Sequence, residues 1–394
     1  MLTLFLWLAA CSSPSPSPAP RPAGIPLRAE PPAPTGGLVD LDHPATCAPC
    51  HGQVVAEWQE SMHARAHHDE DPIYGAMREL RRKKQGDEMA AKCQTCHNPR
   101  APTAPDSPAG KAGVSCATCH HVAELHRDRG PGAKALVFAD RPLLRSARDL
   151  PPDASPVHET GPAAPFLADG QSICLTCHDA TQTPAGAAAC TTGPEHRSQD
   201  GSATCTSCHM PRADGPSGAV STRDHHASHI FAGPHRAWYQ DDPTFLATAV
   251  DLALGLDGST ARLQITNATG HALPTGFPGR MMLVKVRGLD AQGAEVWTNL
   301  GDDPMKQDPD AVFNKVYVDA DGNPTPAPFA VELRRDNRLK PAETRVLTWT
   351  VPSDVATVEA KLVMRLLPPP LAATLGVAEQ VEGEPRTVAT VTAP

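Results

Sequence analysis

The residues best suited to chemistry are cysteines and histidines in a repeated pattern. The chain of 394 residues holds 12 cysteines and 18 histidines, and ten of the cysteines fall into five C-x-x-C-H motifs. The five triplets are Cys47, Cys50 and His51; Cys93, Cys96 and His97; Cys116, Cys119 and His120; Cys174, Cys177 and His178; and Cys205, Cys208 and His209. C-x-x-C-H is the pattern of c-type haem attachment. Five copies therefore predict five covalently attached haem c groups.

The spacing within the motif predicts a role for each of its three residues. Cysteines three positions apart lie on one side of a helical turn, where their sulfurs reach the two vinyl groups of one haem. The histidine that follows then faces the iron as its proximal ligand. Zinc sites and disulfides are the alternatives, because paired C-x-x-C also occurs in zinc ribbons. Zinc needs no particular residue after the second cysteine, so neither alternative accounts for a histidine in all five copies.

Composition limits the kind of core and partner. Aromatic residues make up 4% of the chain, and there are 43 prolines, about twice the usual share of roughly 5%. An ordinary aromatic core is therefore not expected, and most of the chain should fold around something else. The net charge of −9 also argues against a nucleic-acid partner, which would require a basic surface.

The N-terminus predicts an export signal. Residues 2–8 form an apolar run too short to span a bilayer, which takes about 20 residues, so residues 1–11 are interpreted as a signal peptide. Its end, Leu8 to Cys11, resembles a bacterial lipobox, in which cleavage leaves Cys11 lipidated; a plain cleaved signal is the alternative. Residues 12–37 are rich in proline and serine and predict an extended tether. Because haem c is attached outside the bacterial cytoplasm, we expect a lipid-anchored protein on the periplasmic side of a membrane, with the outer membrane as one option.

Two folded domains are predicted, which gives the fold class α+β. Residues 38–240 hold the five motifs and 17 of the 18 histidines, and form a pentahaem domain of short helices and loops, with helices at 53–66 and 72–92. About 40 residues are available per haem, so the haems must pack against one another, and the motifs at Cys93 and Cys116 are the expected stacked pair. Residues 245–394 carry β-type runs at 248–254, 260–266, 281–289, 312–318, 344–351 and 357–366. Such short runs between turns predict an antiparallel β-sandwich of the immunoglobulin-like kind.

Five haems need up to five distal ligands, and histidine is the favoured type. The 13 histidines outside the motifs exceed the demand, so mostly bis-His coordination is predicted, with lower potentials than Met/His coordination gives. The candidate distal ligands are His63, His158, His229, His235 and His271. His63 is expected to reach a neighbouring haem, and His271 stands alone beyond residue 239. His121 is the reserve candidate, and the remaining pairs His67, His68, His225 and His226 are expected to be solvated.

On these residues, the chain resembles multihaem c-type cytochromes related to hydroxylamine oxidoreductase and to the small tetrahaem electron-transfer cytochrome that serves it. The resemblance spans about residues 38–394. It rests on the W-x-x-S-x-H stretch that ends at His63, on residues 113–116 before the third motif, on residues 208–211 and on the loop 270–276. It implies periplasmic electron transfer through haems in stacked and edge-on pairs. The implied partners are other cytochromes or quinol-linked membrane complexes.

Three classes of function remain open. In an electron carrier every haem iron has six ligands and no residue is catalytic. A redox enzyme for a small nitrogen compound, such as nitrite or hydroxylamine, needs one open iron. The sequence has no C-x-x-C-K motif, and Tyr74, Tyr239 and Tyr317 are not near any motif in the sequence, so the carrier is favoured over the enzyme. A haem-bearing adhesion or sensor module is the third class. Cys190 is left over, either as a buried thiol or as a cross-link to a partner.

Overall fold

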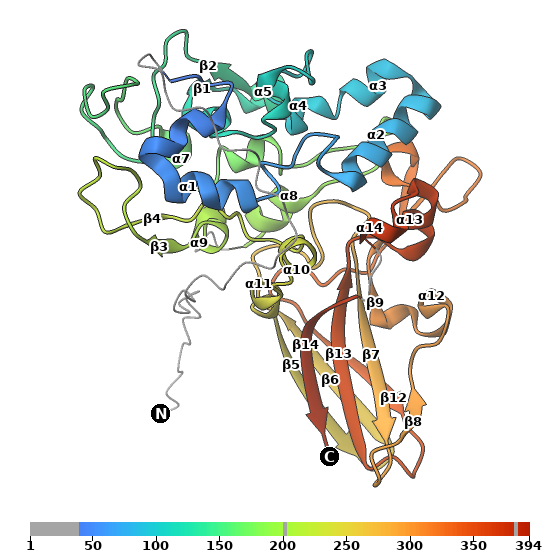
Figure 1. Ribbon diagram of the computed structural model, residues 1–394. Helices are drawn as coiled ribbons and strands as arrows, with labels where there is room; N and C mark the ends of the chain where they lie inside the picture. Colours follow the sequence, from blue (N-terminus) through green and yellow to red (C-terminus); the bar gives the residue numbers. More distant parts are fainter. Residues whose placement is uncertain (1–38, 200–202, 382–384) are drawn as a thin grey trace, which may run out of the picture.

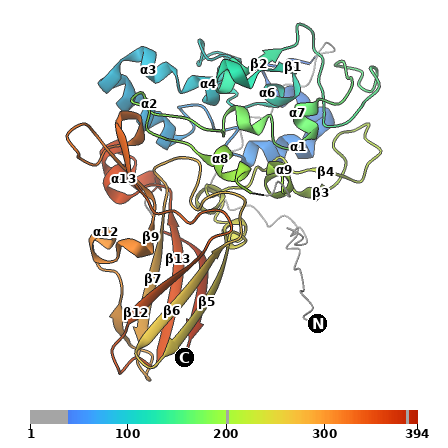
Figure 2. The same cartoon turned by 180° about the vertical axis from the view of Figure 1, so that it is seen from behind.

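The computed structural model describes residues 39–199, 203–381 and 385–394. The predicted signal, Cys11 and the tether at 12–37 lie outside the described residues. Short helices and loops make up one end of the molecule and long strands make up the other (Figure 1), and the view from behind shows the same division (Figure 2). The predicted α+β class, with short helices in the N-terminal part and antiparallel sheets in the C-terminal part, is confirmed. None of the described helices is both long and apolar enough to cross a membrane.

The helical part consists mostly of single turns. Its helices are η1 (Pro44–Cys47), α1 (Ala48–Glu60), α2 (Pro72–Gln85), α3 (Asp87–Ala91), α4 (Gln94–His97), α5 (Pro108–Lys111), α6 (Cys116–His120), η2 (Arg127–Arg129), η3 (Gly132–Ala135), α7 (Pro165–Ala168), η4 (Cys174–Thr176), α8 (Thr192–Arg197), α9 (Cys205–His209), α10 (Arg236–Tyr239) and α11 (Thr244–Ala247). Two small hairpins join them: β1 (Val122–Leu125) with β2 (Leu136–Phe138), and β3 (Arg212–Asp214) with β4 (His225–Ala227).

Both predicted helices exist but end earlier or divide. The first, expected at 53–66, is α1 and ends at Glu60, because Ser61 is extended and its hydroxyl donates to the carbonyl of Trp58. The second, expected at 72–92, begins where Asp71 accepts hydrogen bonds from two amides of the first turn. It divides into α2 and α3 at Gly86, whose φ of 87° no helix can contain and glycine tolerates without strain.

Apolar packing is sparse around the motifs. One buried cluster there joins Val122, Leu136, Ala164 and Phe166. The large cluster lies instead in the C-terminal sheets, and includes Leu263, Ile265, Val284, Phe313, Leu339 and Leu362. A helical part with so small a core depends on something else to fill its interior, as its composition predicts.

The C-terminal strands form a sandwich. One sheet has the order β12-β6-β5, and the other has the order β14-β13-β7-β8, with β9 also paired to β7. The strands are β5 (Val250–Asp257), β6 (Thr260–Asn267), β7 (Met281–Leu289), β8 (Glu295–Thr298), β9 (Val312–Phe313), β12 (Thr344–Thr350), β13 (Thr357–Arg365) and β14 (Arg386–Ala393). Lettered along the chain, β5, β6 and β12 take the places of immunoglobulin strands A, B and E, and β7, β13 and β14 those of C, F and G.

All six predicted β runs lie on strands, and three further strands were not predicted. The run 312–318 divides into β9 and β10 (Lys315–Val318), and β10 forms a separate hairpin with β11 (Glu332–Asp336). The strands β8, β11 and β14 are the additions. The remaining short helices are α12 (Pro304–Gln307), η5 (Pro309–Ala311), η6 (Ala327–Phe329), α13 (Pro369–Leu375) and α14 (Ala378–Val381).

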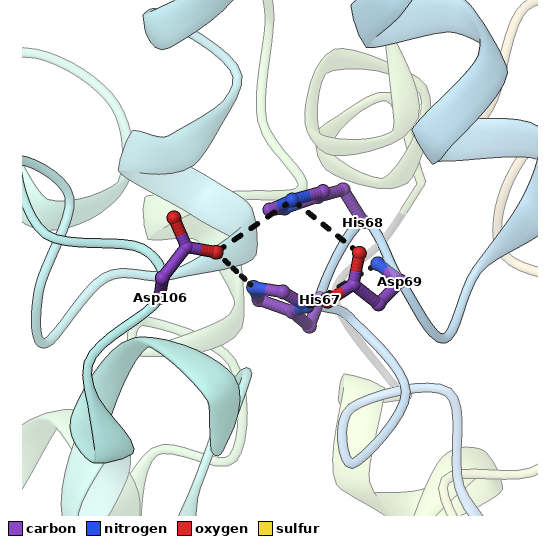
Figure 3. A group of neighbouring side chains, drawn as sticks. All are labelled: His67, His68, Asp69 and Asp106. Atoms are coloured by element: carbon purple, nitrogen blue, oxygen red, sulfur yellow. Dashed lines mark hydrogen bonds and ion pairs between the residues drawn. The ribbon is translucent and has the colours of Figure 1, made fainter.

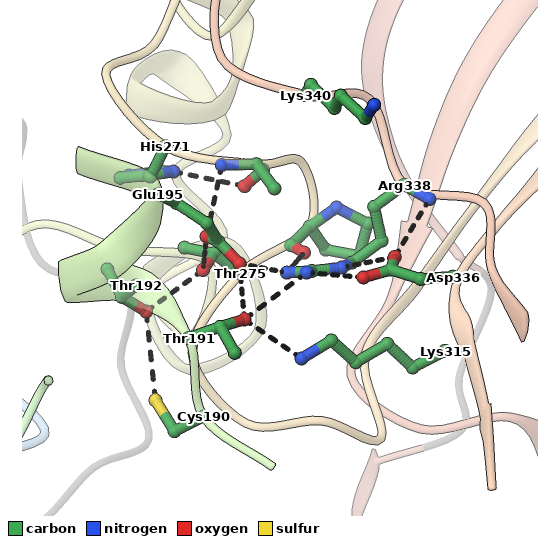
Figure 4. A network of polar contacts seen from close by, with 12 residues as sticks. Cys190, Thr191, Thr192, Glu195, His271, Thr275, Lys315, Asp336, Arg338 and Lys340 are labelled. Atoms are coloured by element: carbon green, nitrogen blue, oxygen red, sulfur yellow. Dashed lines mark hydrogen bonds and ion pairs between the residues drawn. The ribbon is translucent and has the colours of Figure 1, made fainter. Parts of the chain in front are cut away.

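A buried polar network joins the two parts (Figure 4). The carboxylate of Glu195, on α8, accepts hydrogen bonds from the amide of Ala272 (3.1 Å) and the hydroxyl of Thr275 (2.6 Å), and pairs with Arg338 (2.8 Å). Burial raises the pKa of Glu195, but hydrogen bonds from hydroxyls, including that of Thr275, and the Arg338 charge outweigh it and leave the pKa below its usual value. The loop that carries His271 is thereby fixed to the helical part.

Candidate haem centres

Each C-x-x-C-H motif lies on a helical turn, as its spacing predicts. The motifs occupy the junction of η1 and α1, the helices α4, α6 and α9, and the turn η4 with the residues after it. All eleven cysteines of the described chain are free thiols. Every motif therefore presents two unlinked thiols on one face of a turn, next to its histidine.

Backbone carbonyls fix the orientation of four motif histidines. The Nδ1 contacts are His51 to Ser217 (2.6 Å), His97 to Ala66 (3.0 Å), His120 to Arg145 (2.7 Å) and His209 to Ala232 (2.7 Å). A carbonyl oxygen only accepts, so Nδ1 is the donor and Nε2 keeps its lone pair free. Metal-bound histidines are oriented in the same way.

Four motif histidines each face one predicted distal ligand. The pairs are His51 with His158 (ring centres 6.5 Å apart), His178 with His63 (6.3 Å), His120 with His229 (6.2 Å) and His209 with His271 (6.3 Å). These separations are much wider than the 3.7 Å between the stacked rings of His97 and Tyr74. The ring of His63 faces the histidine of the fourth motif rather than that of the first motif, which precedes it in the chain.

The separations fit one metal ion between the two rings of each pair. A metal–imidazole bond is about 2.0–2.1 Å long, and a ring nitrogen lies about 1.1 Å from the ring centre, so two rings on opposite sides of one ion have centres about 6.2 Å apart. Three of the distal partners also hold Nδ1 against a carbonyl oxygen, which leaves Nε2 for the ion: His158 (3.1 Å), His229 (2.8 Å) and His271 (3.1 Å). The four histidine pairs therefore fit a haem iron with one histidine ligand on each side.

Burial favours the neutral form of His63, His178, His229 and His271. Desolvation, with the charge of nearby histidines, lowers the pKa of His63 to about 3 and the pKa values of His178 and His229 to about 4. His271 also has its pKa lowered to about 4, chiefly by burial. A neutral ring is the form that binds iron, because the protonated ring has no lone pair.

The W-x-x-S-x-H stretch positions His63 through the third motif. The indole of Trp58 donates to the carbonyl of Val114 (2.9 Å), and the amide of Val114 donates to the carbonyl of His63 (3.0 Å). A Cβ on Gly113 would come within 2.7 Å of the His63 carbonyl. Two of the sequence features behind the family resemblance are thus halves of one contact that fixes a predicted ligand.

His271 is held just as firmly from its own side. The amide of Asn267, a residue 1% exposed, donates to the carbonyls of His271 (2.8 Å) and Lys340 (2.9 Å). Leu273 and Leu339 exchange backbone hydrogen bonds of 2.8 and 3.0 Å. The β-sandwich therefore presents one imidazole to the fifth motif at a fixed angle.

The motifs whose thiols are neighbours in space are not always the motifs that follow one another in the sequence. Thiols within hydrogen-bonding reach of one another are those of Cys47 and Cys116, Cys96 and Cys177, and Cys174 and Cys205. Cys119 lies near both thiols of the fourth motif. The fourth motif thus borders the second, third and fifth, and the first borders the third. The thiol of Cys116 meets that of Cys47, and the stacking of the haems at Cys93 and Cys116 stays a prediction.

His97 has a different neighbour. Its ring stacks on Tyr74, with ring centres 3.7 Å apart and planes at 19°, and within the described chain no histidine faces it at the separation of the four pairs. Burial and the nearby Cys93 thiol raise the pKa of Tyr74 above its usual range, and its hydroxyl has no hydrogen-bond partner there. Tyr74 is not near any motif in the sequence, but α2 brings its ring against His97 of the second motif.

His235, also a predicted distal ligand, lies apart from the motif histidines. Its ring is parallel to that of Tyr239, with centres 6.1 Å apart, and its Nδ1 lies 3.5 Å from the guanidinium of Arg280. Burial lowers the pKa of His235 to about 3 and raises the pKa of Tyr239 to about 12. The hydroxyl of Tyr239 and Nε of Arg280 are buried without a hydrogen-bond partner among the described residues.

Comparisons with known proteins agree with this geometry. The sequence pattern of the family "Cytochrome c554 and c-prime" matches residues 46–121, which hold the first three motifs. A penta-heme cytochrome c552 from Thermochromatium tepidum is similar in structure, with a TM-score of 0.73 and 28% identity over 88% of this chain and 97% of that one. The fold is that of a multihaem c-type cytochrome. No curated protein matches the sequence.

The sequence gives little indication of which other histidine and cysteine side chains are enclosed by the fold. His121, the reserve ligand, uses both nitrogens elsewhere, on Arg100 (3.0 Å) and on the carbonyl of Arg141 (2.9 Å). His226, expected to be solvated, is 5% exposed and bonds Glu57 at 3.0 Å. The thiol of Cys190 is half-buried, 3.8 Å from the hydroxyl of Thr192. Only the fold decides which of these side chains is enclosed.

Proposed function

We propose that this protein carries electrons between redox partners through five covalently bound haem c groups, four of them with two histidine ligands. The observation that carries the proposal is the set of four imidazole pairs 6.2–6.5 Å apart, each containing one motif histidine. A carrier needs irons whose ligands do not change during turnover, and buried, hydrogen-bonded histidines on both sides meet that need.

In this proposal the chain supplies attachment, orientation and exclusion of water. The ten motif cysteines form the thioether links, and the five motif histidines are the proximal ligands. The distal ligands are His158, His63, His229 and His271, for the first, fourth, third and fifth haem respectively. Bound haem iron changes between two oxidation states and so holds one electron. The contacts between motif cysteines support a route from the first motif through the third to the fourth, where the second and fifth meet it.

We propose that the protein is located on the periplasmic side of a bacterial membrane. The support for this location is the lipobox-like ending at Cys11, the Pro/Ser-rich residues 12–37 and the export that haem c attachment requires. A lipid on Cys11 would hold the haems near the surface while the tether gives them reach to partner cytochromes or quinol-linked complexes. Metabolic labelling with a fatty acid tests it: wild type incorporates the label and Cys11→Ala does not.

Haem counting and spin counting test the main proposal. We expect a pyridine haemochrome assay to give five haems per chain, and low-temperature EPR of the oxidised protein to give four low-spin haems. Fewer than five covalent haems in protein matured by a c-type assembly system, or fewer than four low-spin signals, would contradict it. A redox titration then gives the potential of each centre.

One observation favours a second function, catalysis at the haem of the second motif. Among the described residues no histidine pairs with His97, and Tyr74, which stacks on its ring, has a buried hydroxyl without a hydrogen-bond partner. An iron with one protein ligand would accept a small nitrogen compound such as nitrite or hydroxylamine. Titration with cyanide tests this second function. Binding of one equivalent, with loss of one high-spin signal, supports an open iron. If no cyanide binds, no iron is open and electron transfer is the single proposed function.

A further inference from the structure

A group of four potential metal ligands lies outside the haem centres (Figure 3). His67, His68 and Asp69 follow one another after α1, and Asp106 comes from the turn before α5. Each offers one ligand atom, and the four atoms all lie within 4.8 Å of one another. The group joins two segments that are almost 40 positions apart in the sequence.

The distances from Nε2 of the two rings to the aspartate oxygens are too long for direct hydrogen bonds. His67 Nε2 lies 3.8 Å and His68 Nε2 3.9 Å from the same Asp106 oxygen, and His68 Nε2 lies 3.6 Å from Asp69 Oδ1. Two ligands of one tetrahedral ion, each about 2.0–2.2 Å from it, lie roughly 3.3–3.6 Å apart. The group is therefore spaced as ligands around an ion are spaced, with a slight excess.

Other histidine–carboxylate contacts of this protein differ. His43 and Asp40 lie 2.7 Å apart, and His226 and Glu57 lie 3.0 Å apart. Two exposed pairs, His126 with Glu124 and His225 with Asp224, are also short, at 2.8 and 2.6 Å. These pairs bond directly. The group around His67 has carboxylates within reach of its rings and yet makes none of these short contacts.

Burial makes the open arrangement costly unless something fills it. His67 was expected to be solvated but is 1% exposed, and its Nε2, which faces Asp106, has no hydrogen-bond partner. Nδ1 of His68 is also buried without one. A buried polar atom without a partner costs about 1–3 kcal/mol. An ion at the centre of the group would satisfy Nε2 of His67 directly.

We propose that His67, His68, Asp69 and Asp106 bind one divalent transition-metal ion of the zinc class. Two imidazoles and two carboxylates are a donor set that suits zinc, and imidazole disfavours calcium and magnesium. Nε2 of each histidine and one oxygen of each aspartate are the ligand atoms. Nδ1 of His67 accepts a hydrogen bond from the amide of Asp69 (3.2 Å) and lies 3.4 Å from its Oδ2. Binding of the ion to Nε2 would place the ring proton on Nδ1, so the amide contact would open and Oδ2 would become the acceptor, as in other zinc sites.

The proposed site lies next to the second motif, where a bound ion would have a structural role. Ala66, immediately before the group, supplies the carbonyl that accepts the Nδ1 proton of His97 at 3.0 Å. Binding of the ion links this segment to the turn of Asp106, and therefore stiffens the support of the His97 ring. The site is separate from the haem ligands, so its occupancy and the number of haems are independent quantities.

Zinc titration of the holoprotein tests the site. Tag-free protein with its haems attached is treated with EDTA, dialysed and titrated with Zn²⁺ alone by calorimetry. We expect one tight equivalent in wild type. Asp106→Asn should weaken it by about tenfold or more, because even groups that only support metal ligands account for 10–100-fold in affinity. His68→Ala should weaken it similarly, and zinc-edge X-ray absorption should show imidazole nitrogen together with oxygen.

Asp140→Asn is the matched control, since Asp140 is an exposed aspartate of the same helical part and the variant has the same charge change. It should bind Zn²⁺ as wild type does. The haem count and visible spectrum, unchanged in every variant, report that the fold is intact. Two results overturn the proposal: the absence of a tight equivalent in wild type, or the same tight equivalent in Asp106→Asn and His68→Ala as in wild type.

Discussion

The replacement His271→Ala removes the imidazole that the β-sandwich presents to the fifth motif. The rings of His271 and His209 have centres 6.3 Å apart, with planes at 20°. Alanine ends at Cβ and cannot reach an iron between them. The loop itself should stay in place, because Asn267 bonds the backbone carbonyl of residue 271 and Glu195 bonds the amide of Ala272, and neither contact uses the imidazole.

The size of the effect follows from the number of histidine pairs. Four pairs predict four low-spin haems, and His271→Ala leaves three, so the low-spin EPR intensity per chain should fall by about a quarter while one high-spin signal is gained. The potential of that haem should rise, because a nitrogen donor that favours ferric iron is lost. The haem count should stay at that of wild type, since Cys205 and Cys208 still hold the fifth haem.

EPR of the oxidised protein, with spin integration and a redox titration, measures both effects. His196→Ala is the matched control, because His196 lies near the same loop but bonds Gln171 at 3.2 Å and is not paired with a motif histidine. His271→Met should restore a low-spin haem at a higher potential, since a thioether can replace the imidazole. A wild-type number of low-spin haems in His271→Ala would refute the assignment and leave His271 a structural loop residue.

Three further outcomes are expected. Cys205→Ala should lower the pyridine haemochrome count by one haem, whereas Cys190→Ala should leave it unchanged; an equal loss in both would contradict the assignment of thioether cysteines. Glu195→Ala should destabilise the junction by about 3 kcal/mol, because breaking a buried ion pair costs 3–5 kcal/mol and Arg338 keeps a second carboxylate; calorimetric unfolding, compared with Glu195→Gln, measures it. Burial lowers the pKa of Lys315 to about 8 in the folded protein, whereas a lysine in the unfolded chain has a pKa of about 10.4. Because the folded form loses its proton first, the free energy of unfolding should rise by up to roughly 3 kcal/mol between pH 8 and pH 10.5. Lys315→Met should flatten that rise, and an unchanged slope would show that another group causes it.

Local features of this protein could be predicted from the sequence because their causes are local. A C-x-x-C-H motif needs only one helical turn to align two thiols and a histidine, and all five motifs lie on such turns. The six β runs became strands because alternating side chains suit a sheet with one buried face. The early end of α1 at Glu60 and the break at Gly86 were missed, although a serine and a glycine marked them. The strand β14 was also missed, although its valines and threonines favour strands.

The sequence alone determined the C-x-x-C-H motifs and the fold class, since the motifs and the β runs each depend on residues within a few positions of one another. Only the tertiary structure decided which histidine faces which motif. His63 and His178 are 115 positions apart, and His209 faces His271 from another part of the fold. It also decided that His97 meets Tyr74, that His235 meets Arg280, and that His67 is buried. Pairing and burial depend on how separate segments pack together, and the packing of distant segments leaves no periodic trace in the sequence around any one histidine.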